Sequence, residues 1–554
     1  MSRAVRALWP LALIGLAAFV VWSPTLAIPA PGDSFGYDLE WSRQFSQLLL
    51  AGDAYPRWMP ASFDGLGSPA FYFYPPLPFF VVALISGAAG GLASAALQLK
   101  LAGLALFAVS GWSMYAWLRA VTTPVKALIG ALVYLAAPYH FDDHFLRGDL
   151  AEFAAMAVLP LVALGLKRTA DGARLGAPLL AAAYAVLILA HLPLALLASL
   201  LLTAPYGLFL ALRAEIGRWR VLATQVAALA AGAGLAGAYL VPALTLQGAI
   251  SADYWWSARF QPADGVLTNP HAWSSSLLVL LGATAIAEGA LAVLIAAQRP
   301  RRAEPLFWGG AALLVLALLA GVWPGFWSLP LIAKVQFPWR AMALGEFALV
   351  TVIGVAPALT PRRLALAGAA LVFANPALLT TARMLAQPPA PVAAAAPAEA
   401  LYTPEYLPAG MLRIERGMPV PKVGFDTLRA LPLVAGAGAS AEADPVSGAL
   451  ALRLAPGPAR TLIARRFYFP SWQASCDGRP AAVHPIGPAR LAAIDVPAGA
   501  SSCSLAIGLT PAERLGWWIS LASGLALAAW LAATLAPLAT ARRRPPALAP
   551  APVA

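Results

Sequence analysis

The feature that most constrains the fold of this chain is a series of long apolar stretches separated by short polar connections. A helix of about 20 apolar residues crosses the ~30 Å hydrocarbon core of a membrane. Backbone amides in lipid must bond within their own segment, so such stretches become helices. Hydrophobic residues make up 60% of the 554 residues, above the ~45–50% of an ordinary soluble domain. The sequence therefore predicts an all-α polytopic membrane protein.

Basic residues gather in alternate connections, and acidic and aromatic residues gather in the others. Cytoplasmic loops carry the excess of lysine and arginine, so this alternation predicts cytoplasmic N- and C-termini and explains the net charge of +12. Nucleic-acid binding is not expected, because no basic stripe with interleaved aromatics lies outside these loops. About twelve crossings are predicted, near residues 7–28, 96–118, 126–138, 150–167, 175–190, 193–213, 221–246, 276–297, 305–322, 339–360, 363–383 and 515–540.

Residues 77–91 are apolar, but counting them as a crossing would invert every later loop, so a re-entrant or surface helix is expected there. The apolar run near the N-terminus is longer than the ~7–15 residues of a signal-peptide core and predicts a retained first helix. The expected parts are a membrane domain at 1–386 with an outer loop at 31–75, an extracytoplasmic linker and β-rich domain at 387–512, a final crossing at 513–541 and a cytoplasmic tail at 542–554.

The β-rich part is predicted from short alternating runs after about Leu450, which turn signals such as Asp477-Gly478 separate. A small antiparallel module is expected. Both cysteines, Cys476 and Cys503, lie in it, on the side where oxidation is expected. A disulfide between them is left open, since sequence alone does not show that the two are adjacent.

The first part of the first outer loop brings together Asp33, Asp38 and Glu40. Asp38 begins a predicted amphipathic helix on the membrane surface, where a lipid-linked substrate would lie. A carboxylate there could accept the proton of an acceptor group. The alternative is that Asp38 only caps or stabilises the start of that helix.

The second outer loop holds more charged residues, followed by a crossing. Asp142, Asp143 and His144 are weak candidates for a metal site, which a loop this short does not close by itself. Arg147 could hold a phosphate through two hydrogen bonds. Asp149 and Glu152 lie at the mouth of the crossing, where a charge is costly in lipid and marks a functional site. The alternative is an Arg147–Glu152 ion pair with an acid at the helix start.

Further candidates lie at other outer helix ends. Trp339 and Arg340 could clamp a phosphate or a sugar ring, or anchor the helix at the interface, and Arg340 is a candidate partner for the intramembrane Glu346. His191 lies in the break between two short predicted crossings. It either contacts a ligand or only forms a hydrogen bond with backbone groups at a helix end. Walker A, GxSxG and HExxH motifs are absent, which argues against ATP-driven transport and two hydrolase classes.

The outer-loop strings resemble those of a family of bacterial membrane proteins related to the GT-C glycosyltransferases, some of them labelled 6-pyruvoyl-tetrahydropterin synthase-related. The tail resembles the outer β domain of YfhO-type proteins. The matching strings are DLEW at 38–41, GDAYPRW at 52–58, GLGSP at 65–69, FYFYPP at 71–76, LRGDLAE at 146–152, LPL at 159–161, FPWR at 337–340 and FYFPSWQASCDG at 467–478.

The resemblance implies a GT-C-like fold with one catalytic carboxylate in each of the first two outer loops, here Asp38 and then Asp149 or Glu152. Relatives often carry a histidine where this chain has Trp41, which departs from the pattern. Pterin chemistry is not expected, because no three-histidine zinc arrangement is evident.

The expected activity is transfer of a sugar from a polyprenyl-phosphate donor to an envelope glycan, lipid or protein, on the outer face of a bacterial inner membrane. Asp38 would activate the acceptor, and the other substrate-binding candidates are Arg57, Arg147, Trp339, Arg340, His191 and Tyr74. Dependence on a divalent cation is left open. The alternatives are a flippase-like or non-catalytic protein that handles lipid-linked sugars, and a structural protein whose β module binds a partner.

Overall fold

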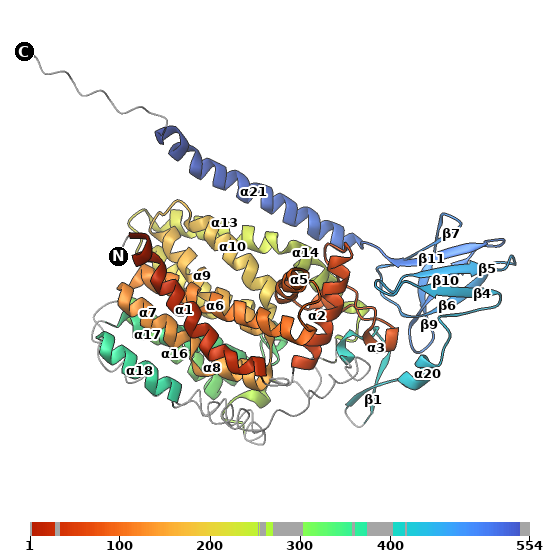
Figure 1. Ribbon diagram of the computed structural model, residues 1–554, viewed down its shortest axis with the longest axis horizontal. Helices are drawn as coiled ribbons and strands as arrows, with labels where there is room; N and C mark the ends of the chain where they lie inside the picture. Colours follow the sequence, from red (N-terminus) through yellow and green to blue (C-terminus); the bar gives the residue numbers. More distant parts are fainter. Residues whose placement is uncertain are drawn as a thin grey trace, which may run out of the picture.

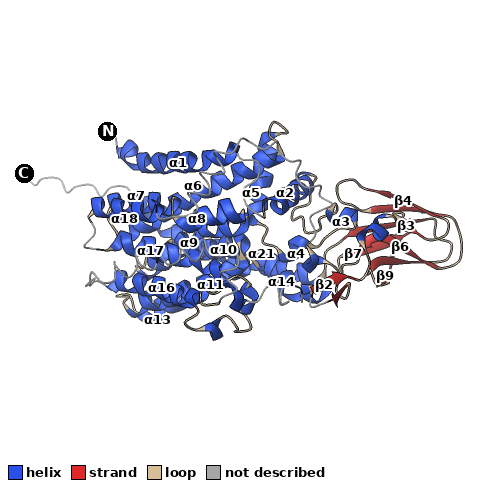
Figure 2. Ribbon diagram, turned by 90° about the horizontal axis from the view of Figure 1, so that it is seen from below, coloured by secondary structure: helices blue, strands red, loops and turns tan. Residues whose placement is uncertain are grey.

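The protein forms a bundle of helices with a β domain at one end (Figures 1 and 2). The computed structural model describes residues 3–27, 34–252, 254, 262–269, 288, 303–356, 360–373, 403–415 and 418–542. Asp33 and, apart from residue 288, the crossing predicted at 276–297 lie outside the described residues.

The helices of the bundle follow the predicted apolar stretches. They are α1 (Arg3–Ala27), α2 (Phe35–Leu50), α3 (Ser62–Gly65), α4 (Ala70–Phe73), α5 (Leu77–Ala89), α6 (Ala95–Val121), α7 (Pro124–Leu135), α8 (Pro138–Phe141), the π-helix η1 (Asp142–Arg147), α9 (Leu150–Ala170), α10 (Gly176–Ala190), α11 (Leu192–Ala198), η2 (Ser199–Thr203), α12 (Ala204–Leu212), α13 (Arg218–Leu235), α14 (Gly237–Thr245), α16 (Ala303–Ala320), the 3-10 turn η10 (Pro338–Ala341), α17 (Met342–Val355), α18 (Pro361–Phe373) and α21 (Pro511–Arg542).

Seven helices in the described part of the chain are long and apolar enough to cross a membrane, and an eighth span results if α13 and α14, bent by 72°, are counted together. The count of twelve therefore stays a prediction. Helices do lie at three of the other predicted crossings, α7, α10 and α18. Of these, α7 and α10 have only 12 and 15 residues, and the described part of α18 has 13. The 13 residues of α5 span roughly 20 Å at 1.5 Å per residue, and the re-entrant or surface position expected for this helix stays a prediction.

Two helices form the centre of the bundle, α9 and α17, whose apolar windows are 89% and 94% buried. Small residues let neighbouring helices approach them closely. A Cβ at Gly165 of α9 would lie 2.7 Å from the Cα of Leu180 in α10. The last helix, α21, runs instead along the outside over α13 and α14, and a Cβ at Gly516 would lie 2.6 Å from the carbonyl oxygen of Gly237. The remaining surface of α21 is apolar and faces away from the protein, as a helix in lipid does.

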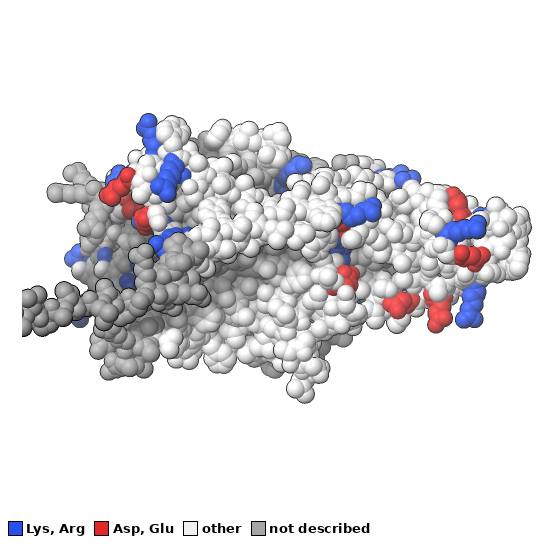
Figure 3. Space-filling view, turned by 90° about the horizontal axis from the view of Figure 1, so that it is seen from above, with Lys and Arg blue, Asp and Glu red and all other residues white. Residues whose placement is uncertain are grey.

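The N-terminus and the end of α21 lie at the end of the bundle opposite the β domain (Figure 1). Lys126 at the start of α7 donates to the carbonyl of Ala356 after α17 at 2.8 Å. On the face drawn in Figure 3, charged side chains gather at this end and over the β domain, with a mostly uncharged band between them. Such a band is what a membrane-spanning bundle presents to hydrocarbon.

The β domain confirms the predicted antiparallel module and begins earlier than the alternating runs suggest. One sheet has the order β3-β6-β10-β9 and the other β4-β5-β11-β7-β8, with a separate β1-β2 pair. The strands are β1 (Leu412–Glu415), β2 (Met418–Pro421), β3 (Val434–Ala435), β4 (Ala439–Ala443), β5 (Leu450–Leu454), β6 (Arg460–Phe467), β7 (Trp472–Cys476), β8 (Arg479–Ala481), β9 (Val483–Ile486), β10 (Leu491–Val496) and β11 (Ser502–Ile507). Cys476 and Cys503, directly opposite on β7 and β11, form a disulfide.

The first loop joins the bundle to the β domain. Phe467 donates its backbone N–H to the carbonyl of Leu66 at 2.8 Å, and Arg429 in the helix α20 (Phe425–Arg429) pairs with Asp64 at 2.7 Å. Asp64 has a left-handed backbone with φ 59°, which a tight turn imposes. The β domain is therefore held against the same loop that leads from Asp38.

Candidate functional site

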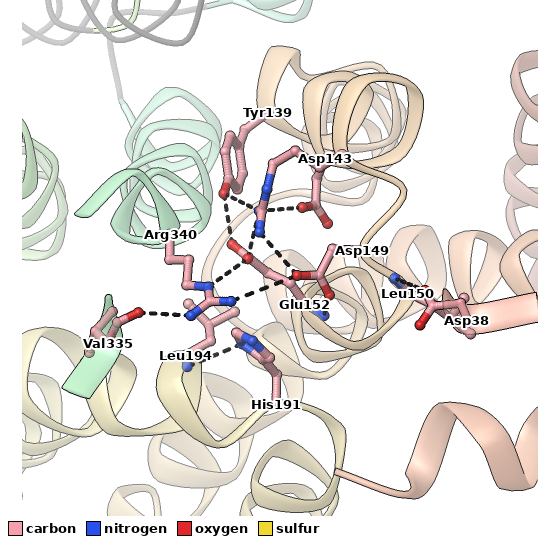
Figure 4. Close-up of polar contacts among 11 residues, drawn as sticks. Asp38, Tyr139, Asp143, Asp149, Leu150, Glu152, His191, Leu194, Val335 and Arg340 are labelled. Carbon is pink, nitrogen blue, oxygen red and sulfur yellow. Dashed lines mark hydrogen bonds and ion pairs between the residues drawn. The ribbon is translucent and has the colours of Figure 1, made fainter. Parts of the chain in front are cut away.

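The start of α9 carries the densest set of buried charges in the described part of the chain (Figure 4). Gly148 turns the chain with φ 65°, and Asp149 then caps α9 by accepting from the N–H of Glu152 at 2.9 Å. Arg147, at the end of η1, donates to Glu152 at 2.7 Å and to Asp149 at 3.0 Å. The alternative reading of an Arg147–Glu152 pair with an N-terminal acid is confirmed, but the cluster is larger.

Two more elements complete this cluster. Arg340 belongs to η10, the turn that leads directly into α17. Its guanidinium lies 3.3 Å from Glu152 and 3.9 Å from Asp149. Its Nη1 donates to the carbonyl of Val335 at 2.8 Å, so the guanidinium is oriented from both sides. His191, between α10 and α11, accepts from the N–H of Leu194 through Nδ1 at 3.3 Å.

Asp38 reaches the same place from the first loop. It lies in the first turn of α2, is buried, and accepts from the N–H of Leu150 at 3.2 Å. Burial raises the pKa of Asp38 well above its usual range, and the carboxylate of Asp149 raises it further. Burial raises the pKa of Tyr74, and the charges of Asp149 and then Asp38 raise it further. Carboxylates far apart in the sequence therefore converge, as the alternation of loops requires.

Asp149 behaves differently from Asp38 although it too is buried. Burial would raise the pKa of Asp149, but the guanidinium of Arg147, with that of Arg340, holds it below its usual range. Burial, with the charge of Arg340, lowers the pKa of His191 to about 4, so the imidazole is neutral at pH 7. The site thus pairs one carboxyl that readily holds a proton with one that stays ionised.

A small cavity of about 30 Å³ lies beside Asp38 and is also lined by Lys100, His144 and Asp149. It has room for one or two water molecules and none for a sugar. Substrate binding at Asp38 therefore requires this end of the bundle to open. Trp22 forms part of the wall, donates to the carbonyl of Lys100 at 3.0 Å and stacks on His144 at 3.8 Å.

A divalent cation fits this site only in part. Asp149, Glu152 and His191 offer ligand atoms that lie within 4.8 Å of one another, a donor set that suits a transition metal. All four carboxylate oxygens already accept hydrogen bonds, from Arg147, Arg340, Tyr139 and the N–H of Glu152. A cation would compete with both arginines, so the question of cation dependence stays open and no step is assigned to a cation.

The three weak metal candidates are not brought together in the described structure. Asp143 pairs with Arg147 at 2.6 Å, and His144 packs on Trp22. The predicted pairing of Glu346 with Arg340 is wrong. Glu346 lies 2.9 Å from His140 and accepts from the N–H of Tyr139 at 2.8 Å, because α8 brings both to α17.

Two predicted substrate-binding residues make other contacts. Arg57 pairs with Glu513 of α21 at 3.0 Å, donates to the carbonyl of Ala238 at 2.7 Å and lies over the ring of Tyr55. None of these contacts reaches the cluster around Arg147. Trp339 stacks on Phe337 with ring centroids 4.7 Å apart, and its buried indole nitrogen has no hydrogen-bond partner among the described residues.

Two residues of the site were missed from the sequence. Tyr139 links the cluster by donating to Glu152 at 2.7 Å and accepting from Arg147 at 3.0 Å. A tyrosine near a helix end gives no such signal, because interfacial tyrosines are common. Lys100 lies within the apolar helix α6, where a charge is costly, and that position alone was a detectable signal.

Comparison with known proteins gives a family and two distant structures. The model of a membrane protein family described as 6-pyruvoyl-tetrahydropterin synthase related domain matches residues 71–375. No curated protein matches the chain. A solved structure of the arabinofuranosyltransferase AftD from mycobacteria is 21% identical, with 70% of this chain and 27% of that one covered at a TM-score of 0.44. A mutant form of AftD gives 21% identity, 67% and 28% coverage and a TM-score of 0.41. The chain thus spans just over a quarter of the length of these structures, and the site is interpreted from its own residues.

Proposed function

The chain belongs to the 6-pyruvoyl-tetrahydropterin synthase related family of membrane proteins, and from this premise we propose that it is a membrane glycosyltransferase of the GT-C type. One observation carries the proposal. Asp38 of the first loop, Asp149 and Glu152 at the start of α9, and the guanidiniums of Arg147 and Arg340 meet at one end of the bundle. Catalysis of transfer from a phosphate leaving group requires a base and fixed positive charge at one place.

In the proposed reaction, Asp38 accepts the proton of an acceptor hydroxyl. The hydroxyl oxygen forms a bond to the anomeric carbon of a polyprenyl-phosphate-linked sugar, on the face opposite the phosphate. The bond from the anomeric carbon to the phosphate oxygen breaks, and the phosphate leaves with the electron pair. Arg147 and Arg340 stabilise its charge, because guanidinium groups bind phosphate through paired hydrogen bonds.

Asp149 and Glu152 support this reaction by holding the two guanidiniums, each of which they contact. Buried carboxylates orient arginines at the cost of their own solvation, which the ion pairs offset in part. A direct catalytic role of either acid, and substrate contacts of Tyr74, His191 and Trp339, stay predictions. The disulfide in the β domain supports an outer-face site, because disulfides persist in oxidising compartments.

The proposed sidedness also follows from charge. The site lies toward the β domain, and the N-terminus and the end of α21, both rich in arginine, lie at the opposite end of the bundle. By the positive-inside rule, the site then faces outward and the two termini face the cytoplasm of a bacterial inner membrane. The acceptor is proposed to be an envelope glycan, lipid or protein.

The test compares Asp38→Asn with Glu40→Gln in membrane vesicles supplied with a radiolabelled polyprenyl-phosphate sugar. Glu40 is the matched control, since it is two residues away in α2 and pairs with the partly exposed Arg43. Loss of a general base lowers the rate by about 10²–10⁴-fold, so Asp38→Asn is expected to lose transfer and Glu40→Gln to keep it.

Transfer that persists in Asp38→Asn at normal protein level removes Asp38 from the mechanism. In cells, carrier-linked sugar that accumulates on the outer leaflet of the Asp38→Asn strain supports the transferase. Accumulation on the inner leaflet points to flipping instead, which is the alternative function.

A further inference from the structure

A second cavity, of about 340 Å³, lies between the bundle and the β domain. Its walls come from the end of α14 and the residues after it (Thr245, Leu246 and Ala249), from Pro408, and from Tyr468 and Arg490 of the β domain. The volume falls in the ~300–1,000 Å³ range of sites for small molecules and is about ten times that of the cavity beside Asp38. This space is not part of the transfer site described above.

Backbone hydrogen bonds join the two segments on the bundle side of this cavity. Ile250 and Pro408 form an isolated antiparallel bridge. Ala409 donates to the carbonyl of Ala249 at 3.0 Å, and Ser251 donates to the carbonyls of Leu407 and Pro408 at 2.8 and 3.0 Å. These bonds satisfy the backbone groups on both sides of the bridge.

The β-domain side presents one charged group and one aromatic ring. Tyr468 donates its backbone N–H to the carbonyl of Arg490 at 2.9 Å, which holds the two residues side by side at the edge of β6 and β10. No acidic side chain lines the cavity, and Arg490 forms no ion pair with any residue that the structure describes. A half-buried arginine next to a tyrosine is suited to an anionic group on a ring, through bidentate hydrogen bonds and stacking.

The backbone of Arg490 adds an independent reason. Its φ is +55°, in the left-handed region where glycine or asparagine is usual. Non-glycine residues held in this region carry a conformational cost and are found more often at ligand-contacting positions.

We propose that this cavity binds an acidic sugar unit, one that carries a carboxylate or a phosphate, with Arg490 contacting the anion and Tyr468 stacking on the ring. Identification of that sugar as part of the acceptor glycan rests on the proposed function, whereas the binding itself does not. The cavity would hold the glycan at a distance from the reacting hydroxyl.

The test measures binding to the full chain in lipid nanodiscs, in an Asp38→Asn background so that no transfer consumes the probe. The probes are trigalacturonate, galactose 6-phosphate and neutral galactotriose, and calorimetry measures the affinity of each. At least one acidic probe is expected to bind about tenfold or more tightly than galactotriose, and the stronger one distinguishes carboxylate from phosphate recognition.

Arg490→Gly is the informative variant, because it removes the guanidinium and relieves the backbone strain. It is expected to weaken acidic-probe binding about 10- to 100-fold without lowering the unfolding temperature, and Arg490→Gln is expected to give the same loss. Arg453→Gln, an equal loss of charge at an exposed position of β5, is the control and should bind as the parent does.

Equal binding of acidic and neutral probes, or binding that Arg490→Gly and Arg490→Gln leave unchanged, overturns the proposal. The two proposals fail separately. Transfer that survives Asp38→Asn rejects the enzymatic mechanism and leaves the calorimetric result as it stands.

Discussion

The buried ion pair between Arg57 and Glu513 allows a sharp test of what Arg57 does. The pair joins the first loop to the start of the last helix, and the two side chains are only 4% and 2% exposed. The sequence predicts that Arg57 binds substrate, whereas its contacts in the structure are those of a structural arginine. We therefore consider Arg57→Gln, Glu513→Gln and the double variant.

The size of the effect follows from burial. Removing one partner of a buried ion pair leaves an uncompensated charge and costs about 3–5 kcal/mol of unfolding free energy. If the two changes acted independently, the double variant would lose the sum of the unfolding free energies that the two single variants lose. Because the double variant buries no charge, we expect its loss to stay near that of one single variant, a coupling of about 3 kcal/mol. The pair of Arg43 and Glu40, whose side chains are 41% and 15% exposed, is the control and is worth about 1 kcal/mol or less.

Unfolding in mixed micelles of fixed composition, followed by tryptophan fluorescence, measures the stabilities, and the vesicle assay gives KM for the sugar donor. The structural role predicts that both single variants lose stability and that Glu513→Gln mimics Arg57→Gln. An Arg57→Gln protein as stable as its parent, with KM raised about tenfold and no matching effect in Glu513→Gln, would refute this reasoning. Arg57 would then return to the substrate site.

Three further predictions follow from the site and the β domain. Burial and then the charge of Asp149 raise the pKa of Asp38, and only the ionised carboxylate accepts a proton. We therefore expect kcat/KM to increase with pH, with the increase at a higher pH than the pKa of an ordinary aspartate would give. The folded chain holds the Asp38 proton more tightly than the unfolded chain does, so the free energy of unfolding decreases as pH rises through the same interval. Asp38→Asn should remove both pH dependences. An increase of kcat/KM centred at the pKa of an ordinary aspartate would contradict this. Arg147 and Arg340 already form ion pairs with the carboxylates of Asp149 and Glu152. Chelation with EDTA and the variant His191→Ala are therefore each expected to reduce the rate of transfer less than about threefold. Strict metal dependence would show that a cation replaces the arginines at these carboxylates. Replacing Cys476 and Cys503 by serine opens a loop with a sequence separation of 27 and is expected to cost about 3–4 kcal/mol, measured by unfolding of the β domain; equal stability with and without reductant would contradict this.

Much of the helical architecture was predictable because apolar length and the alternation of basic and acidic loops are local properties. The helix α5 is shorter than a full crossing, as is α10, so its predicted re-entrant or surface position stays a prediction. The bend between α13 and α14, at Ala236 between the two helices, was not predicted. Directly after the bend Gly237 meets Gly516 of α21, a contact between distant segments that no local pattern reveals.

The candidate site was predictable where a charged residue lies at the end of a predicted helix. Asp38, Asp149, Glu152, Arg147 and Arg340 were singled out for that reason, and the structure brings them together. Pairings between distant elements were not predictable. Glu346 and Arg57 each have more than one oppositely charged candidate in the sequence, and only packing of α8 on α17, and of the first loop on α21, selects His140 and Glu513.

The link between Arg57 and Glu513 also bears on biogenesis. Arg57 emerges from the ribosome early, whereas Glu513 is synthesised only after most of the chain has been made. Until α21 inserts, the guanidinium has no counter-charge in its final location, and the groove over α13 and α14 lacks its covering helix. Nascent chains halted before residue 511 are therefore expected to remain incompletely assembled and to be recognised by membrane quality control, however well their earlier helices have inserted.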